Sequence, residues 1–195
     1  MLEPRDRSLL LDQLRPPVGY KLDFAIGTTF TLDLVALLGA PLAFALLDRT
    51  DREGRLAPDP VALIEALRRN ADKFAIFCQA GHIAVPPVDR SLLTMLEGNV
   101  IEVTPRTAGV FHPKVWALRF LGPEGDVRYR LLCGTRNVTF DRSWDTMLSL
   151  EGPLRDRKNG YSANKPLAEF FAALPGLAVN AVEPGIQGRI GQFQD

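Results

Sequence analysis

Residues 110–134 read VFHPKVWALRFLGPEGDVRYRLLCG, and this stretch predicts a β-hairpin. Two β-rich runs, 110–121 and 127–134, flank a turn that contains two glycines and a proline. Both alternating faces of the first run are mostly apolar, as in a central strand that is covered on each side. We therefore expect Val110–Leu121 to be a long buried strand that pairs with Val127–Gly134.

Strands and helices alternate along the rest of the chain. The patterns predict strands over 21–29, 74–79, 99–104 and 146–150, and helices over 31–38, 59–70 and 165–174. From Pro175 onward no convincing packed element is expected. This alternation predicts an α/β fold, with a mixed β-sheet flanked by helices on both faces. Residues 1–195 are expected to form a single domain.

The composition fits one ordinary globular domain and excludes a disordered chain. The chain has 195 residues, of which 46% are hydrophobic, and 23 basic side chains balance 23 acidic ones. The longest apolar run, 35–47, is too short to span a membrane, so no membrane partner is expected. Cys78 and Cys133 lie in apolar stretches, which predicts buried free thiols in a reducing cytoplasm.

The neutral total conceals an uneven distribution of charge. Residues 1–103 carry 11 Lys/Arg and 14 Asp/Glu, whereas residues 104–195 carry 12 and 9. Residues 104–142 are the most basic part, with seven basic and three acidic side chains. A basic segment of this kind indicates an anionic ligand, although a solvated surface has the same pattern.

Several polar residues are expected to converge beside the hairpin. His112 and Lys114 share one face of the first run, Asn137 follows the second, and Asp145 precedes the 146–150 strand. Together they would supply an imidazole nucleophile, two donors for phosphate oxygens and a carboxylate that orients the imidazole. The alternative is structural: Lys114 pairs with an internal carboxylate, and His112 is a satisfied core imidazole.

His112-Pro113-Lys114, followed by Gly134-Thr135-Arg136-Asn137 and Asp145, resembles the His-x-Lys and Gly-Ser-x-Asn signature of the phospholipase D superfamily. The resemblance implies that His112 forms a phosphohistidine, while Lys114 and Asn137 hold the phosphate. Thr135 then stands in the place of the usual serine, and Asp145 in the place of an acidic residue that contacts the histidine. It implies neither a metal nor a cofactor.

The chain departs from this signature at two points. The aspartate five residues after the lysine is replaced by Arg119, and the gap between Lys114 and Gly134 is longer than usual. Superfamily members that act on nucleic-acid phosphodiesters also lack that aspartate, so a nuclease-like member is favoured over a lipid hydrolase.

Enzymes of this superfamily use two histidines, because one attacks phosphorus while another protonates the leaving oxygen. The other histidine of this chain, His82, has no lysine two residues later, and we interpret it as structural. The second half-site is therefore expected from another copy, either in a homodimer or because this chain is the N-terminal half of a longer protein.

The leading hypothesis is a metal-independent phosphodiesterase, most simply a nuclease acting on DNA or RNA. Three further arginines are expected to line the substrate path with Thr135, namely Arg106, Arg136 and Arg142. The alternative is a non-catalytic module that binds nucleic acid or acts as a scaffold and retains the same fold.

Overall fold

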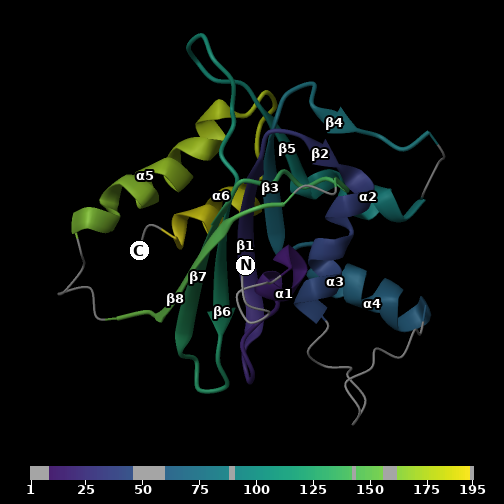
Figure 1. Ribbon diagram of the computed structural model, residues 1–195. Helices are drawn as coiled ribbons and strands as arrows, with labels where there is room; N and C mark the ends of the chain where they lie inside the picture. The colour runs from purple at the N-terminus through teal and green to yellow at the C-terminus, as the bar shows by residue number, and fades with distance from the viewer. Residues whose placement is uncertain (1–8, 46–59, 88–90, 142–143, 156–161, 194–195) are drawn as a thin grey trace.

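The computed structural model describes residues 9–45, 60–87, 91–141, 144–155 and 162–193, which form a layered α/β structure (Figure 1). A six-stranded sheet in the order β5-β3-β1-β6-β7-β8 lies in the middle. In this sheet β1, β3 and β5 run parallel to one another. Strands β6, β7 and β8 form an antiparallel meander, and β6 pairs antiparallel with β1. The strands are β1 (Lys21–Thr29), β3 (Phe74–Gln79), β5 (Val100–Val103), β6 (Val115–Leu121), β7 (Val127–Gly134) and β8 (Met147–Pro153). The predicted mixed sheet is confirmed.

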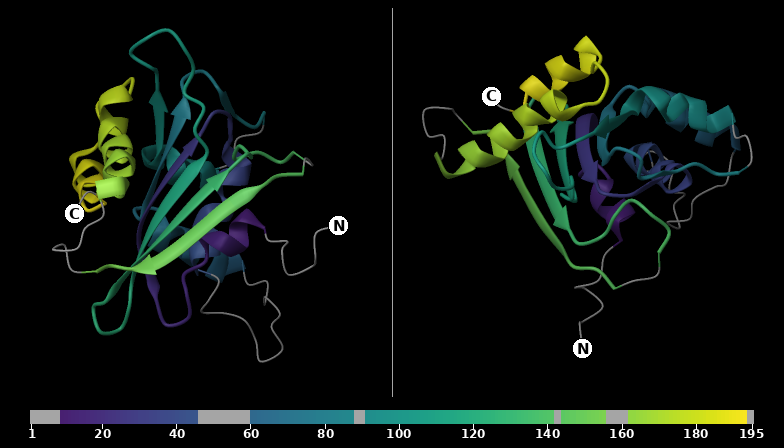
Figure 2. Two further views of the ribbon diagram at one scale, coloured as in Figure 1. Left: turned by 60° about the vertical axis from the view of Figure 1, so that its left-hand side comes forward. Right: turned by 90° about the horizontal axis from the view of Figure 1, so that it is seen from above.

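Helices cover both faces of this sheet, as predicted (Figure 2). On one side lie α1 (Leu10–Leu14), α2 (Leu34–Leu37), α3 (Gly39–Ala45), α4 (Pro60–Asn70) and the 3-10 helix η3 (Ser91–Asn99). On the other lie α5 (Lys165–Ala173), which follows the short η5 (Ser162–Asn164), then η6 (Leu174–Leu177) and α6 (Pro184–Gly191). A small parallel sheet joins β2 (Leu32–Asp33) to β4 (Ile83–Ala84). Within the described part of the chain, every helix is too short or too polar to cross a bilayer.

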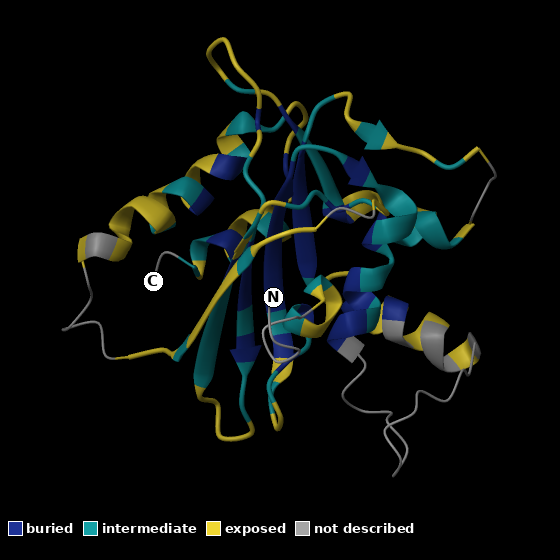
Figure 3. Ribbon diagram, viewed as in Figure 1, coloured by how far each residue is buried: buried dark blue, intermediate teal, exposed yellow. Residues whose placement is uncertain are grey.

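The two helical layers create two hydrophobic cores, one on each face of the sheet. Strand β3 shows why: Phe74, Ile76 and Cys78 enter the core under α1–α3, while Ala75 and Phe77 enter the core under α5 and α6. Alternate side chains of a strand point to opposite faces, so a strand that is apolar at every position is buried on both. Figure 3 shows the resulting buried centre of the sheet along β1 and β3.

The predicted strand over 110–121 is wrong in its first half, because β6 begins only at Val115. Pro113 has no N–H to give to a ladder and so interrupts the pairing. Val115 pairs with Cys133 of β7, and on its β1 side the Thr28 side chain takes the place of a backbone partner. Thr28 Oγ1 accepts from Val115 N (2.9 Å) and donates to Val115 O (3.2 Å). Residues 110–114 are therefore an irregular segment that leads into the sheet, and His112 is exposed rather than buried.

The expectation that nothing packs after Pro175 is also wrong. Helix η6 and helix α6 close the core under α5 and α6, where Leu174 and Ile190 are buried. Glycines at 185, 188 and 191 weaken the helical pattern of α6, which explains why its sequence does not predict it. Long-range packing of Ile190 compensates for that low propensity.

Candidate active site

The entries to β6 and β8 and the exit of β7, next to which His112, Lys114, Asn137 and Asp145 lie in the chain, are at the end of the sheet opposite the β6–β7 turn (Figure 1). Gly134 N donates to Lys114 O (2.9 Å), so the exit of β7 lies beside the entry to β6, as the hairpin predicts. The carboxyl end of β1 reaches the same place, because Gly27 pairs with Trp116. The carboxyl ends of parallel strands are where α/β folds commonly place ligand sites.

His112 and Lys114 contact each other directly. Lys114 Nζ lies 3.0 Å from Nδ1 and 3.2 Å from Nε2 of the His112 ring, and it donates to the His112 carbonyl at 3.2 Å. The His112 side chain is exposed and Lys114 is partly buried. Burial lowers the pKa of the Lys114 ammonium below its ordinary value. The pair therefore places an accessible imidazole and a partly desolvated cation at one point.

Two threonines at the end of β1, Thr28 and Thr29, organise this region. Thr28 holds Val115, next to Lys114, through the two hydrogen bonds described above. Thr29 Oγ1 donates to Thr31 O (2.7 Å) and accepts from Val138 N (3.1 Å), next to Asn137. Both hydroxyls are fully buried. Their sequence signal is a pair of hydroxyl residues that ends a buried parallel strand.

Asn137 is fixed by the backbone that follows β1. Its Oδ1 accepts from Phe30 N (3.2 Å) and Thr31 N (3.5 Å), and Thr29 Oγ1 lies 3.4 Å from it. These bonds occupy the carbonyl end of the amide and leave the Nδ2 donor as the end that can meet an anion. The Phe30 ring also contacts the His112 ring, with 4.9 Å between centroids. Phe30 thus contacts Asn137 through its backbone N–H and His112 through its ring.

Asp145 belongs to a separate network in the loop after β7. Thr135 Oγ1 donates to Asp145 Oδ1 (3.2 Å) and accepts from Thr146 N (3.1 Å). Arg136 Nη1 lies 3.4 Å from Asp145 Oδ2, and Arg136 also donates to the Thr139 and Asp141 carbonyls. Among the described residues, Asp145 has these contacts and none with His112. The resemblance implied that Asp145 contacts the His112 imidazole, but the structure does not bring the two side chains together.

Most cations of the basic segment are paired locally. Arg119 pairs with Asp23, Arg128 and Arg130 pair with Glu151, and Arg136 pairs with Asp141 and Asp145. Among described basic residues of 104–142, Lys114 and Arg106 lack a carboxylate partner, and Arg106 donates to the Gly176 carbonyl instead. Arg142 lies outside the described residues. The basic segment therefore concentrates its unpaired charge on Lys114 within the site.

Arg119, which replaces the aspartate of the superfamily signature, has a structural environment. It pairs with Asp23 of β1, and Arg189 of α6 pairs with the same carboxylate at 2.8 Å. The group joins neighbouring strands to the C-terminal helix. The residue that departs from the signature, Arg119, therefore takes part in a structural ion pair away from His112.

The two cysteines differ, which corrects the prediction that both are buried. Cys78 is buried and Cys133 is exposed, and both are free thiols. Burial, with a smaller contribution from the Glu102 carboxylate, raises the pKa of Cys78 to about 12. At pH 8 we expect Ellman's reagent to modify one thiol per native chain, Cys133, and two per denatured chain. Rapid modification of both thiols in the folded protein would contradict this assignment.

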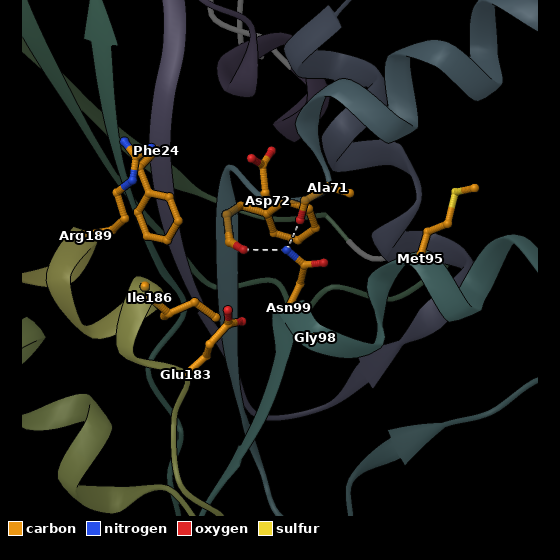
Figure 4. A pocket seen from close by; sticks show the side chains of 11 residues that line it. Phe24, Ala71, Asp72, Met95, Gly98, Asn99, Glu183, Ile186 and Arg189 are labelled. Atoms are coloured by element: carbon orange, nitrogen blue, oxygen red, sulfur yellow. Dashed lines mark hydrogen bonds between the residues drawn. The ribbon is translucent and has the colours of Figure 1, made fainter.

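A hollow of about 430 Å³ lies at the other end of the sheet (Figure 4). It opens at the amino ends of β3 and β5, roughly 17 Å along the strands from the His112 end. Asn99 Nδ2 donates to the carbonyls of Ala71 and Phe74, and Glu183, Ile186 and Arg189 of the C-terminal region complete the wall. None of the predicted site residues that the structure describes lines this hollow.

The six-stranded mixed sheet with helices on both faces forms an α/β fold, and one end of that sheet carries His112, Lys114 and Asn137. This fold is similar to three crystal structures of mutants of yeast tyrosyl-DNA phosphodiesterase, with TM-scores of 0.53, 0.54 and 0.53 and 13–14% sequence identity. Each comparison covers 93% of this chain but 36% of the yeast chain, so the domain spans about a third of that enzyme's length. No protein-family model and no curated protein matches the chain.

Proposed function

We propose that this protein is a phosphodiesterase that cuts nucleic acid through a phosphohistidine intermediate on His112. The observation that supports it most is the contact between the exposed His112 imidazole and the unpaired Lys114 ammonium, beside the anchored amide of Asn137. The similar fold of tyrosyl-DNA phosphodiesterase, whose name places a DNA phosphodiester in its substrate, supports nucleic acid as the substrate class.

In the proposed reaction, a ring nitrogen of His112 attacks phosphorus, the N–P bond forms and the P–O bond to the leaving group breaks. A second imidazolium gives its proton to the leaving oxygen. Water then attacks phosphorus, its proton passes to that imidazole, and the N–P bond breaks to release the phosphomonoester. Lys114 Nζ and Asn137 Nδ2 stabilise the charge on the non-bridging oxygens throughout. No step requires a metal.

Thr135, Arg136 and Asp145 act in this proposal through the loop that carries Asn137. Their mutual hydrogen bonds tie Thr135 and Arg136 to Asp145 and Thr146, which helps to keep Asn137 at the end of β1. Arg106 and Arg142 are proposed to meet the flanking phosphates of the polyanion.

Both cysteines are free thiols, which fits a reducing cytoplasm.

The second imidazole is proposed to come from another copy of the domain, in a homodimer or in a longer chain. The single His-x-Lys motif supports this arrangement. In a homodimer with one shared site, the specific activity should rise with protein concentration and level off when sedimentation gives twice the 21.5 kDa chain mass. Full specific activity of a strict monomer would refute the shared site.

The function itself is tested by incubating the protein with end-labelled single-stranded DNA, duplex DNA and RNA in EDTA. We expect cleavage of at least one substrate to continue in the chelator, with a phosphomonoester at the new end. Salt-sensitive binding with no cleavage of any substrate would favour the non-catalytic module instead.

A further inference from the structure

Three aromatic rings form a row at the edge of the candidate site. The Phe30 ring lies 4.3 Å from the His82 ring and 4.9 Å from the His112 ring, centroid to centroid, with tilts of 39° and 44°. The three residues come from different parts of the chain: Phe30 follows β1, His82 lies between β3 and β4, and His112 precedes β6. The fold therefore brings His82 and His112 into contact with the same phenyl ring.

His82 is exposed but its backbone is held firmly. Leu32 N donates to His82 O (3.0 Å), and His82 N donates to Gln79 O (3.1 Å). Gly81 has a φ of +76°, which lets the chain turn directly after β3, and its N–H donates to Glu102 Oε1. Within the described residues, the His82 ring has no polar side-chain partner and rests on Phe30. This anchored turn presents a flat aromatic ring to solvent.

We propose that His82 and Phe30 form a stacking platform for one unpaired nucleobase next to the phosphodiester that His112 attacks. The proposal rests on the proposed function, since His112 and Lys114 would hold the adjacent phosphate. Aromatic rings bind bases through their π faces, with a contribution of about 1–3 kcal/mol per base. Because only Phe30 separates His82 from His112, the base belongs to the nucleotide at the scissile bond or to its neighbour.

The platform selects for a single strand. A base inside a duplex already stacks on both faces, so it must leave the stack before it can lie on His82. The interpretation of His82 as merely structural is thereby replaced: its backbone is structural, and its ring recognises the base.

The test measures binding of two oligonucleotides of equal length, one with 2-aminopurine bases and one abasic. We expect the protein to bind the base-bearing strand roughly tenfold more tightly, with quenching of the 2-aminopurine fluorescence. His82→Ala should remove both the preference and the quenching, whereas His82→Phe should keep them. Val85→Ala, at an exposed apolar position three residues later, is the matched control and should behave as the wild type.

Equal affinity of the wild type for the two strands would overturn the platform, as would loss of the preference in His82→Phe. Cleavage of the two strands at saturating protein concentration in EDTA reports separately on the chemistry at His112. If neither strand is cut but the base preference persists, the phosphodiesterase proposal fails and the platform stands as a base-binding site. If the abasic strand is cut but bases add no affinity, the platform fails and the phosphodiesterase stands.

Discussion

His112→Ala is expected to reduce cleavage of nucleic acid by about 1,000-fold or more, because the nucleophile is lost and no neighbouring group replaces it. The assay is single-turnover cleavage of an end-labelled strand in EDTA, compared with the wild type. Denaturation in alkaline detergent should also trap the labelled strand on the wild-type protein and not on the variant, since the N–P bond forms on the His112 ring and resists alkali but not acid.

The matched control is Val110→Ala, which removes an exposed apolar side chain two residues earlier in the same irregular segment. It should retain the wild-type cleavage rate. A variant lacking His112 that cuts at the wild-type rate would rule out His112 as the nucleophile. Undiminished activity together with a covalent intermediate would show that another residue carries the phosphate.

Asp23→Ala is expected to destabilise the fold by about 3–5 kcal/mol, because it leaves Arg119 and Arg189 without their shared anion. The Asp23 and Arg119 side chains are only 12% and 18% exposed, so water cannot replace the lost carboxylate fully. The melting temperature should fall by roughly 10 °C for a chain of this size. Differential scanning calorimetry measures this change.

Two comparison variants separate the buried charge from a general effect of removing an aspartate. Asp12→Ala breaks the more exposed pair with Arg15 and should cost less than about 1 kcal/mol. The double variant Asp23→Leu/Arg119→Leu removes both charges and should be more stable than Asp23→Ala alone. If Asp23→Ala melts within about 2 °C of the wild type, the ion pair has no structural importance.

The sheet was largely predictable because each strand carries its own local signal. Lys21–Thr29, Phe74–Gln79 and Val127–Gly134 are confirmed with the predicted bounds. Each is a short run bounded by turn residues, and apolar side chains alternate along the first and last of them, which favours a strand over a helix. Helix α6 was missed because its glycines hide the helical pattern, and its formation depends on burial of Ile190 against distant residues.

The candidate site was predictable to the extent that it follows from the hairpin. Pairing of β6 with β7 brings Lys114 beside Gly134, so the two-strand register suffices to place the start of the loop that carries Asn137 at the entry to β6. The exposure of His112 was not predictable from alternation, since Pro113 has no N–H for the pairing of β6. The backbone of Val115 bonds the Thr28 hydroxyl instead of the β1 backbone. That exchange involves residues 87 positions apart.

Local pattern thus accounts for the α/β class, the hairpin and the spacing of His112, Lys114 and Asn137. Burial, charge pairing and the neighbours of each site residue come from packing between distant segments. Asp145 bonds Thr135 and pairs with Arg136, as other arginines of the basic segment pair with nearby carboxylates. His82 and His112 both contact the Phe30 ring. The reason is physical: periodicity records which face of an element is apolar, whereas contacts between elements depend on the three-dimensional path of the whole chain.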